Sequence, residues 1–241
     1  MIKAILFDLD ATLLPMDQDL FLKTYIGKMA KKMVSLGYNP AEFAEALWMG
    51  SYEMIKNDGT RPNSEAFWSY FCKRFGASAR DDEPTFDAFY RNEYKEAKSV
   101  CGFTPLARPI VERIKSKGLK VVLATNPVFP AVATNERIAW AGLSPDMFEL
   151  ITTYDNIGYC KPNPRYYTEI AYRIGAAPEE CLMVGNDTSD DMSAALAGMQ
   201  VYLVTDCLIN KNGDDISKYK NGTLVEFNAY LDEILPEDNE S

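Results

Sequence analysis

The feature that most constrains the fold of this chain is a series of short apolar runs that alternate with helical patterns. Five runs of four or five residues are rich in Val, Ile and Leu, which is typical of strands buried on both faces of a parallel sheet. These predicted strands are Ala4–Phe7, Lys120–Ala124, Glu149–Thr152, Cys181–Val184 and Val201–Val204. Helical patterns separate the last four strands and cover Pro130–Trp140, Pro164–Ile174 and Asp190–Leu196. The alternation predicts an α/β fold with a doubly wound parallel sheet.

The stretch between the first two predicted strands breaks this alternation. Residues 15–100 contain several helical patterns and no convincing strand, and clusters of Gly, Pro, Asn and Asp interrupt the patterns. We therefore expect residues 1–14 and 101–241 to form the α/β domain and residues 15–100 to form a helical domain inserted after the first strand. More than half of the aromatic residues lie in the insertion, and we expect most of them to build its small core.

The composition excludes several classes of function. Lys and Arg number 25 and Asp and Glu number 35, which gives a net charge of −10 and argues against nucleic acid or an anionic membrane as a partner. The chain contains no His, so catalytic groups must be carboxylates, Lys, hydroxyls or Cys. The five Cys residues form no CxxC motif, and no run resembles a signal peptide or a membrane span. We expect reduced thiols and a cytoplasmic protein.

Two carboxylates follow the first predicted strand directly. Asp8 and Asp10 lie two residues apart, so in extended backbone both side chains point the same way. Like charges at this distance are tolerated if a cation lies between them or if one group keeps its proton, and both arrangements occur in catalytic sites. For either residue alone, opening a turn or capping a helix is the alternative role.

Further polar groups follow two other predicted strands. Thr125 and Asn126 come after the second strand, where a hydroxyl and free backbone amides could hold an anion. The fourth strand leads into a cluster that contains Asp187, Asp190 and Asp191. Oxygen ligands of this kind suit Mg²⁺ better than softer metals.

Lys161 lies between the third and fourth predicted strands, in a segment that two prolines stiffen. Its ammonium could reach a phosphate or offset the nearby acids. Ligands of parallel α/β sheets bind outside the carboxyl ends of the strands, and the groups described above are all expected at that edge. Their joint placement predicts one site for an anion and a metal.

In order along the chain, these segments resemble four motifs of the haloacid dehalogenase-like hydrolases. Residues 7–13 (Phe-Asp-Leu-Asp-Ala-Thr-Leu) are similar to the first motif, Thr125 to the second, Lys161 to the third and residues 185–191 to the fourth. Four motifs in the right order are far more specific than any one of them. The resemblance implies a Rossmann-like core and a helical cap of the C1 type over residues 15–100.

The resemblance also implies a mechanism. Asp8 would attack phosphorus and form an aspartyl-phosphate, and Asp10 would protonate the leaving oxygen and then activate water. Asp8, the Asp10 carbonyl and an acid of the fourth motif would hold Mg²⁺, while Thr125 and Lys161 would bind the phosphate oxygens. The cap would close over the site and select the substrate.

Two positions depart from the pattern of this family. Ala11 stands where Gly is usual, and we expect the turn to survive because the side chain is small. Asn186 stands where the fourth motif often has Asp, and an amide is the poorer magnesium ligand. We expect Asp187 to take its place as the ligand, with Asp191 as the second candidate and Asp190 as the third.

Taken together, the sequence predicts a Mg²⁺-dependent phosphatase that acts on a small phosphorylated metabolite. Asp10 favours a phosphatase over the dehalogenase branch of the family, which has no acid there to protonate a leaving alkoxide. A capped sugar-phosphate mutase with the same residues is an alternative. A phospho-accepting signalling domain similar to response-regulator receivers is another, although receivers are much shorter and lack the insertion. The oligomeric state cannot be predicted from this sequence.

Overall fold

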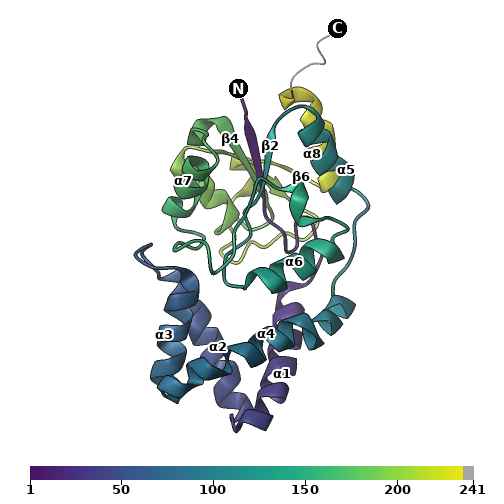
Figure 1. Cartoon of the computed structure of the whole chain (residues 1–241). Helices are drawn as coiled ribbons and strands as arrows, with labels where there is room; N and C mark the ends of the chain where they lie inside the picture. Colours follow the sequence, from purple (N-terminus) through teal and green to yellow (C-terminus); the bar gives the residue numbers. More distant parts are fainter. Residues whose placement is uncertain (236–241) are drawn as a thin grey trace.

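The computed structural model describes residues 1–235, which form a six-stranded parallel sheet flanked by helices (Figure 1). The strands are β1 (Ala4–Phe7), β2 (Lys120–Leu123), β3 (Leu150–Ile151), β4 (Cys181–Gly185), β5 (Gln200–Val204) and β6 (Lys220–Gly222). Their order across the sheet is β3-β2-β1-β4-β5-β6. The chain moves outward from β1 in one direction and then from β4 in the other, so the strand order reverses between them. The predicted α/β class and doubly wound parallel sheet are confirmed, and ligands of such sheets bind at this reversal.

Helices cover both faces of the sheet. They are α5 (Ala107–Ser116), α6 (Ala131–Trp140), α7 (Pro164–Arg173) and α8 (Leu224–Ile234), with 3-10 helices η4 (Pro145–Met147), η5 (Pro178–Glu180), η6 (Asp191–Ala197) and η7 (Ile216–Lys218). Successive residues of β1 point to opposite faces. Ile5 and Phe7 join a core that includes α5, α6 and α8, whereas Ala4 and Leu6 join a smaller core with α7 and η6. Burial on both faces explains why β1 is a continuous apolar run.

Residues 15–100 form helices only and lie at the end of the molecule opposite the N-terminus (Figure 1). The helices are α1 (Gln18–Met33), η1 (Val34–Leu36), α2 (Pro40–Ile55), α3 (Asn63–Phe75), η2 (Ala77–Asp82), α4 (Glu83–Arg91) and η3 (Glu93–Val100). The chain enters and leaves this helical segment side by side, since Met16 and Cys101 form an isolated antiparallel bridge. The Gly102 amide also donates a hydrogen bond to the Pro15 carbonyl at 2.7 Å.

Most aromatic residues of the helical segment build its core, as expected. Phe43, Phe67, Phe71 and Phe86 are buried, and the ring of Phe71 lies 5.4–5.7 Å from the other three. Trp48 is different, because half of its surface stays exposed. These contacts pack the helices of the segment together, and their hydrophobic core is continuous with the core of the sheet domain.

The structure differs from the predicted elements in several places, and it adds the helices α5 and α8, which were not predicted. The strand β6 was missed because it lies at an edge of the sheet, where two of its three residues are exposed. The predicted strand Glu149–Thr152 is shortened to β3, and its half-buried residues occupy the other edge instead of the interior. The predicted helix Asp190–Leu196 is the 3-10 helix η6. The last six residues of the predicted α/β domain lie outside the described part.

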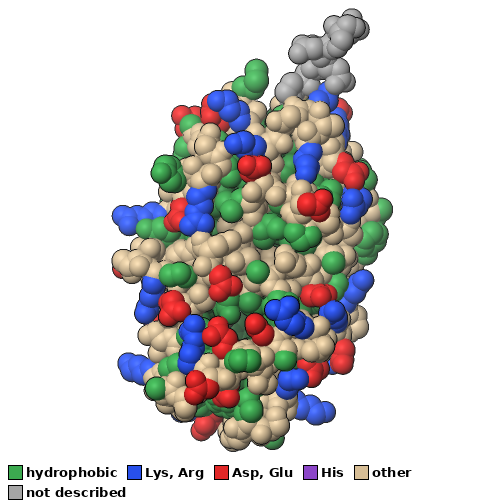
Figure 2. Space-filling model, in the orientation of Figure 1, with side chains coloured by type: hydrophobic (Ala, Val, Ile, Leu, Met, Phe, Trp, Pro, Cys, Tyr) green, Lys and Arg blue, Asp and Glu red, His purple; other side chains and the backbone are tan. Residues whose placement is uncertain are grey.

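The surface in view carries charges of both signs (Figure 2). Figure 2 shows acidic and basic side chains interspersed over the face drawn, so this face offers no extended basic surface to a nucleic acid. All five Cys residues are free thiols. Within residues 1–235, no helix is both long enough and apolar enough to cross a bilayer.

Candidate active site

The loop that follows β1 carries Asp8 and Asp10 in a tight turn. The Asp8 amide continues the sheet ladder by donating to the Val184 carbonyl at 2.9 Å, and the Ala11 amide donates to the Leu14 carbonyl at 2.8 Å. Ala11 has a φ of +63° and is the only non-Gly residue with a positive φ in the described chain. The turn therefore forms as expected, and the Cβ of Ala11 leaves it strained.

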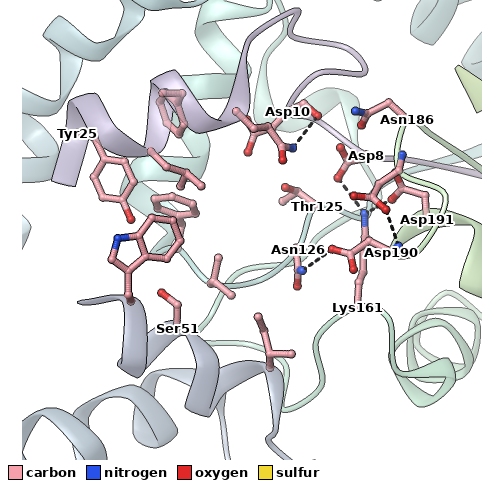
Figure 3. Close-up of a pocket in the computed structure, with 18 of the residues that line it drawn as sticks. Asp8, Asp10, Tyr25, Ser51, Thr125, Asn126, Lys161, Asn186, Asp190 and Asp191 are labelled. Carbon is pink, nitrogen blue, oxygen red and sulfur yellow. Dashed lines mark hydrogen bonds and ion pairs between the residues drawn. The ribbon is translucent and has the colours of Figure 1, made fainter. Parts of the chain in front are cut away.

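Lys161 lies at the centre of the site, between two carboxylates. Its Nζ is 2.8 Å from Oδ1 of Asp8 and 2.6 Å from Oδ1 of Asp191, and all three side chains are buried (Figure 3). Asp8 follows β1, Lys161 precedes α7 and Asp191 begins η6. Three loops that are distant in sequence thus meet at the carboxyl edge of the sheet.

Burial is the main influence on the pKa values of the carboxyl groups in this site. Burial raises the pKa of Asp8 to about 8; the charge of Lys161 opposes this shift, and the Asp191 carboxylate adds to it. Burial also raises the pKa of Asp10, against the opposing charge of Arg137. Burial alone would lower the pKa of Lys161, but Asp191 and Asp8 raise it well above its usual value. Lys161 is therefore a cation, while burial favours the protonated forms of Asp8 and Asp10.

The loop that follows β4 is shaped by Gly185 and by its own acids. A Cβ on Gly185 would lie 2.2 Å from the Asp191 carboxylate, so only Gly leaves room for that carboxylate beside Lys161. Oδ2 of Asp191 accepts a hydrogen bond from the Asp187 amide at 2.9 Å. Oδ1 of Asp187 accepts one from the Asp190 amide at 2.9 Å. Asp187 therefore stabilises the loop while it also lines the pocket.

Asn186 takes a position next to Asp8. Its Oδ1 accepts a hydrogen bond from Oγ1 of Thr12 at 3.0 Å, and the same hydroxyl lies 3.5 Å from Oδ2 of Asp8. Its Nδ2 donates to the Cys207 carbonyl at 2.7 Å, which fixes the orientation of the amide. An amide oxygen of the β4 loop is therefore joined to Asp8 through Thr12.

The loop that follows β2 places Thr125 and Asn126 in the same pocket. The Thr125 carbonyl accepts a hydrogen bond from the Tyr166 hydroxyl at 2.9 Å. Asn126 donates from Nδ2 to Oδ2 of Asp190 at 3.0 Å, and burial raises the pKa of Asp190 to about 6. All three residues predicted to bind phosphate, Thr125, Asn126 and Lys161, line this pocket.

Arg137 belongs to this site and was missed from the sequence. It lies fully buried on α6, and its Nη1 is 3.2 Å from Oδ2 of Asp10. Its guanidinium stacks over the Phe129 ring at 4.0 Å, and its nitrogens make no hydrogen bond within residues 1–235. The one available signal was its spacing of four residues from Ala133 and from Ala141, which places it on the buried face of a predicted helix.

The start of α3 is docked against the loop that carries Lys161. Asn63 is buried, and its Nδ2 donates to the Tyr159 carbonyl at 3.3 Å and to Sγ of Cys160 at 3.2 Å. The backbone N–H of Asn63 donates to the Ile157 carbonyl at 3.0 Å. The helical segment thus contributes directly to positioning the loop that ends at Lys161.

A cavity of about 200 Å³ lies between the sheet edge and the helical segment. Figure 3 shows its two sides: the acids and Lys161 on one, and Tyr25 and Ser51 among apolar side chains on the other. The apolar side chains of this helical wall come from α1 and α2, and they are Phe21, Leu22, Tyr25, Ile26, Trp48 and Ile55. The cavity therefore combines a charged wall with an apolar one.

The donor set of the charged wall fits a hard divalent cation. Within residues 1–235, no three Asp, Glu or Cys side chains cluster closely enough to hold a metal ion by themselves. The groups around Asp8 include the oxygen of Asn186 as well as the Asp191 carboxylate, which shares Lys161 with Asp8. Oxygen ligands suit Mg²⁺, which would need amide or carbonyl oxygens in addition to the acids.

Comparisons with known proteins match this chain to a family. The family model of the haloacid dehalogenase-like hydrolases matches residues 2–198. The chain is 29% identical over 241 residues to a glyceraldehyde 3-phosphate phosphatase of Methanothermobacter thermautotrophicus, with 98% of this chain and 100% of the relative covered. It is 28% identical over 213 residues to a ribulose-1,5-bisphosphate 5-phosphatase of Halopiger xanaduensis, with 84% of each covered. A solved phosphatase structure from Thermococcus onnurineus shares the fold, with a TM-score of 0.57, 23% identity and coverage of 95% of this chain and 98% of that one.

Proposed function

The chain belongs to the haloacid dehalogenase-like hydrolases, and on that premise we propose that it is a Mg²⁺-dependent phosphatase that hydrolyses a small phosphomonoester through an aspartyl-phosphate on Asp8. The observation that carries the proposal is the buried cluster in which Lys161 lies between Asp8 and Asp191 at the pocket floor. The matches to phosphatases that act on phosphorylated sugars support the same substrate class. We further propose that the enzyme works in the cytoplasm. The receiver-like alternative has no support from these matches.

In the proposed first step, an oxygen of Asp8 attacks phosphorus, the bond from phosphorus to the leaving oxygen breaks, and Asp10 gives that oxygen its proton. Burial raises the pKa of Asp10, which helps it to hold this proton. In the second step, Asp10 takes a proton from water, and the water oxygen displaces Asp8 from phosphorus and releases inorganic phosphate. Arg137, 3.2 Å from Asp10, would hold the carboxylate in place and stabilise it while it is ionised.

The remaining residues of the pocket would bind the phosphoryl group. Lys161 supplies a fixed positive charge, and Thr125 and Asn126 supply neutral hydrogen-bonding groups beside it. Stabilisation by fixed charges and donors requires no reorganisation during the reaction.

The candidate Mg²⁺ ligands are Asp8, Asp10, Asp187 and Asp191, and Asn186 joins them because its oxygen is linked to Asp8 through Thr12. When bound, Mg²⁺ would offset the repulsion between the Asp8 carboxylate and the negative phosphate. The choice of Asp187 as the ligand from the β4 loop stays a prediction.

We propose that residues 15–100 act as a cap domain over a core made of residues 1–14 and 101–241. The adjacent crossings at Pro15 and Gly102 support this division, and so does the packing of Phe43, Phe67 and Phe86 around Phe71 within the helical segment. A cap in this position would exclude water and present the apolar wall to the substrate.

Phosphate release from an aryl phosphate tests the proposal. We expect turnover by the wild type with Mg²⁺, a loss of ~10³-fold or more in kcat for Asp8→Asn, and loss of activity with a chelator. Asp81→Asn removes the same charge from an exposed position of the helical segment and should keep the wild-type rate. Equal rates for wild type and Asp8→Asn, or full activity after chelation, would contradict the proposal. With a sugar monophosphate, free phosphate indicates a phosphatase, and a rearranged sugar phosphate indicates the mutase.

A further inference from the structure

The cavity offers one place for an anionic group. Among the described residues that line it, Lys161 is the single cation, and five lining residues are Asp. Arg137 is the other buried cation nearby, but it stacks on Phe129, pairs with Asp10 and does not line the cavity. An anion therefore finds positive charge only beside Lys161.

The helical wall, in contrast, carries no charged side chain. Its polar groups are the hydroxyls of Tyr25 and Ser51, the amide of Gln18 and the indole N–H of Trp48. Burial raises the pKa of the Tyr25 hydroxyl well above its ordinary value, so this group stays protonated and can act as a hydrogen-bond donor. The rest of the wall consists of apolar or aromatic surface.

From these two walls we propose that the substrate is a monophosphate ester whose leaving group is compact and uncharged, with its carbon skeleton against the apolar surface and a hydroxyl or carbonyl within reach of Tyr25 or Ser51. This inference rests on the proposed phosphatase function and narrows it. A carboxylate or a second phosphate on the leaving group would lie against the helical wall with no cation beside it, and removing an unpaired charge from water even in part is unfavourable. The same argument counts against the mutase, since returning a phosphoryl group to a sugar phosphate produces a bisphosphate.

The size of the cavity supports a compact leaving group. Its volume of about 200 Å³ must hold the phosphoryl group as well as the group that leaves. Pockets for drug-sized ligands are larger, at roughly 300–1,000 Å³. A small carbon skeleton fits this space better than a nucleoside or a disaccharide.

A matched pair of substrates tests the inference. Glyceraldehyde 3-phosphate and 3-phosphoglycerate share a three-carbon skeleton, but the first ends in an uncharged aldehyde and the second in a carboxylate. Phenyl phosphate, whose leaving group is neutral and apolar, serves as the reference. We expect kcat/KM to be ~100-fold or more higher for the aldehyde than for the carboxylate, because only the carboxylate buries an unpaired charge. Phenyl phosphate should be hydrolysed as well.

A variant that adds a cation to the helical wall sharpens the test. Ile55 lines the cavity, is 38% exposed and is the last residue of α2, so Lys is tolerated there and suits the helix end. Ile55→Lys should raise kcat/KM for 3-phosphoglycerate by about tenfold or more relative to glyceraldehyde 3-phosphate. Met49→Lys adds the same charge at an equally exposed position of α2 outside the cavity and should leave the ratio unchanged.

The outcomes separate this inference from the proposed function. If the wild type releases no phosphate from any of the three compounds, the phosphatase function itself is wrong. If it releases phosphate but uses 3-phosphoglycerate as well as glyceraldehyde 3-phosphate, the function stands and the inference is overturned. The inference is also overturned if Ile55→Lys and Met49→Lys change the ratio equally, because the effect is then not local to the wall.

Discussion

On the sheet side of the cavity Asp8, Lys161 and Asp191 are buried and paired, whereas on the helical side Trp48 and Ile55 are uncharged and partly exposed. The charged groups must be fixed, because a buried charge that loses its partner destabilises the fold by several kcal/mol. The apolar side chains carry no such constraint. The charged wall at the sheet edge is called the sheet wall below. We infer that changes to the sheet wall alter rate and stability together, while changes to the helical wall alter substrate preference with little effect on stability.

Replacing Lys161 by Met should give the largest effect. Met keeps much of the volume but leaves Asp8 and Asp191 without their shared cation, so we expect kcat to fall ~10²–10³-fold. The free energy of unfolding should fall by about 3–5 kcal/mol at neutral pH or above and by less in mild acid, where the carboxylates can take up protons. Phosphate release and urea denaturation measure the two effects. Lys31→Met, at an exposed position of α1, is the control, and a Lys161→Met protein as stable as this control would refute the role of the sheet wall.

The pH dependence of stability is the next largest effect. The pKa of Asp8 is about 8 in the folded protein and 3.8 in the ordinary case, so between these values the folded protein keeps a proton that the unfolded chain has released. Without Mg²⁺, the free energy of unfolding therefore falls as pH rises from 3.8 to about 8, by at most about 1.4 kcal/mol per pH unit for this group. Urea denaturation in the presence of a chelator measures the slope. The slope should flatten in Asp8→Asn, and an unchanged slope would show that other groups cause it.

Trp48→Ala examines the helical wall. Half of the indole surface is exposed, so the variant should lose no more than about 1 kcal/mol of unfolding free energy. Loss of apolar contact with the leaving group should raise KM by about 5–10-fold for phenyl phosphate while kcat stays nearly constant. Tyr52→Ala removes an aromatic ring that is 49% exposed on the same helix but outside the cavity, and it should change neither constant. A fall in kcat at constant KM would instead assign Trp48 to the chemistry.

The smallest effect is expected at Ala11, in the strained turn that carries Asp8 and Asp10. Ala11→Gly removes the Cβ from a residue with a φ of +63°, and we expect the unfolding free energy to rise by about 0.5–1 kcal/mol with kcat unchanged. Thermal and urea denaturation measure the change. A loss of stability in this variant would mean that the turn is not strained.

How much of the fold could be predicted depended on how far each element is buried. The strands β1, β4 and β5 match the predicted runs to within one residue, because central strands are apolar on both faces. The edge strand β6 has no such signal, since two of its three residues meet solvent. Helical patterns were recognised over residues 15–100, but the sequence did not separate Trp48, which lines the cavity, from Phe43, which is buried in the core.

In the candidate site, too, some residues could be predicted from the sequence and others could not. Asp8, Lys161 and Asp191 could be expected to meet, because loops after parallel strands share one edge of the sheet. Arg137 could not, since it reaches Asp10 from a helix that packs beside that edge. The roles of these residues, the metal ligands and the domain boundaries stay predictions for the experiments above.

The sequence by itself determined the order of the strands along the chain and the polar residues that follow them, because strand burial and the ends of strands are read from neighbouring residues. Tertiary structure alone decided that Asp191 rather than Asp187 pairs with Lys161, that Arg137 faces Asp10, and that an uncharged helical wall closes the cavity. These contacts join residues far apart in the chain, and their distances depend on how helices pack against the sheet and against each other, which no local pattern specifies.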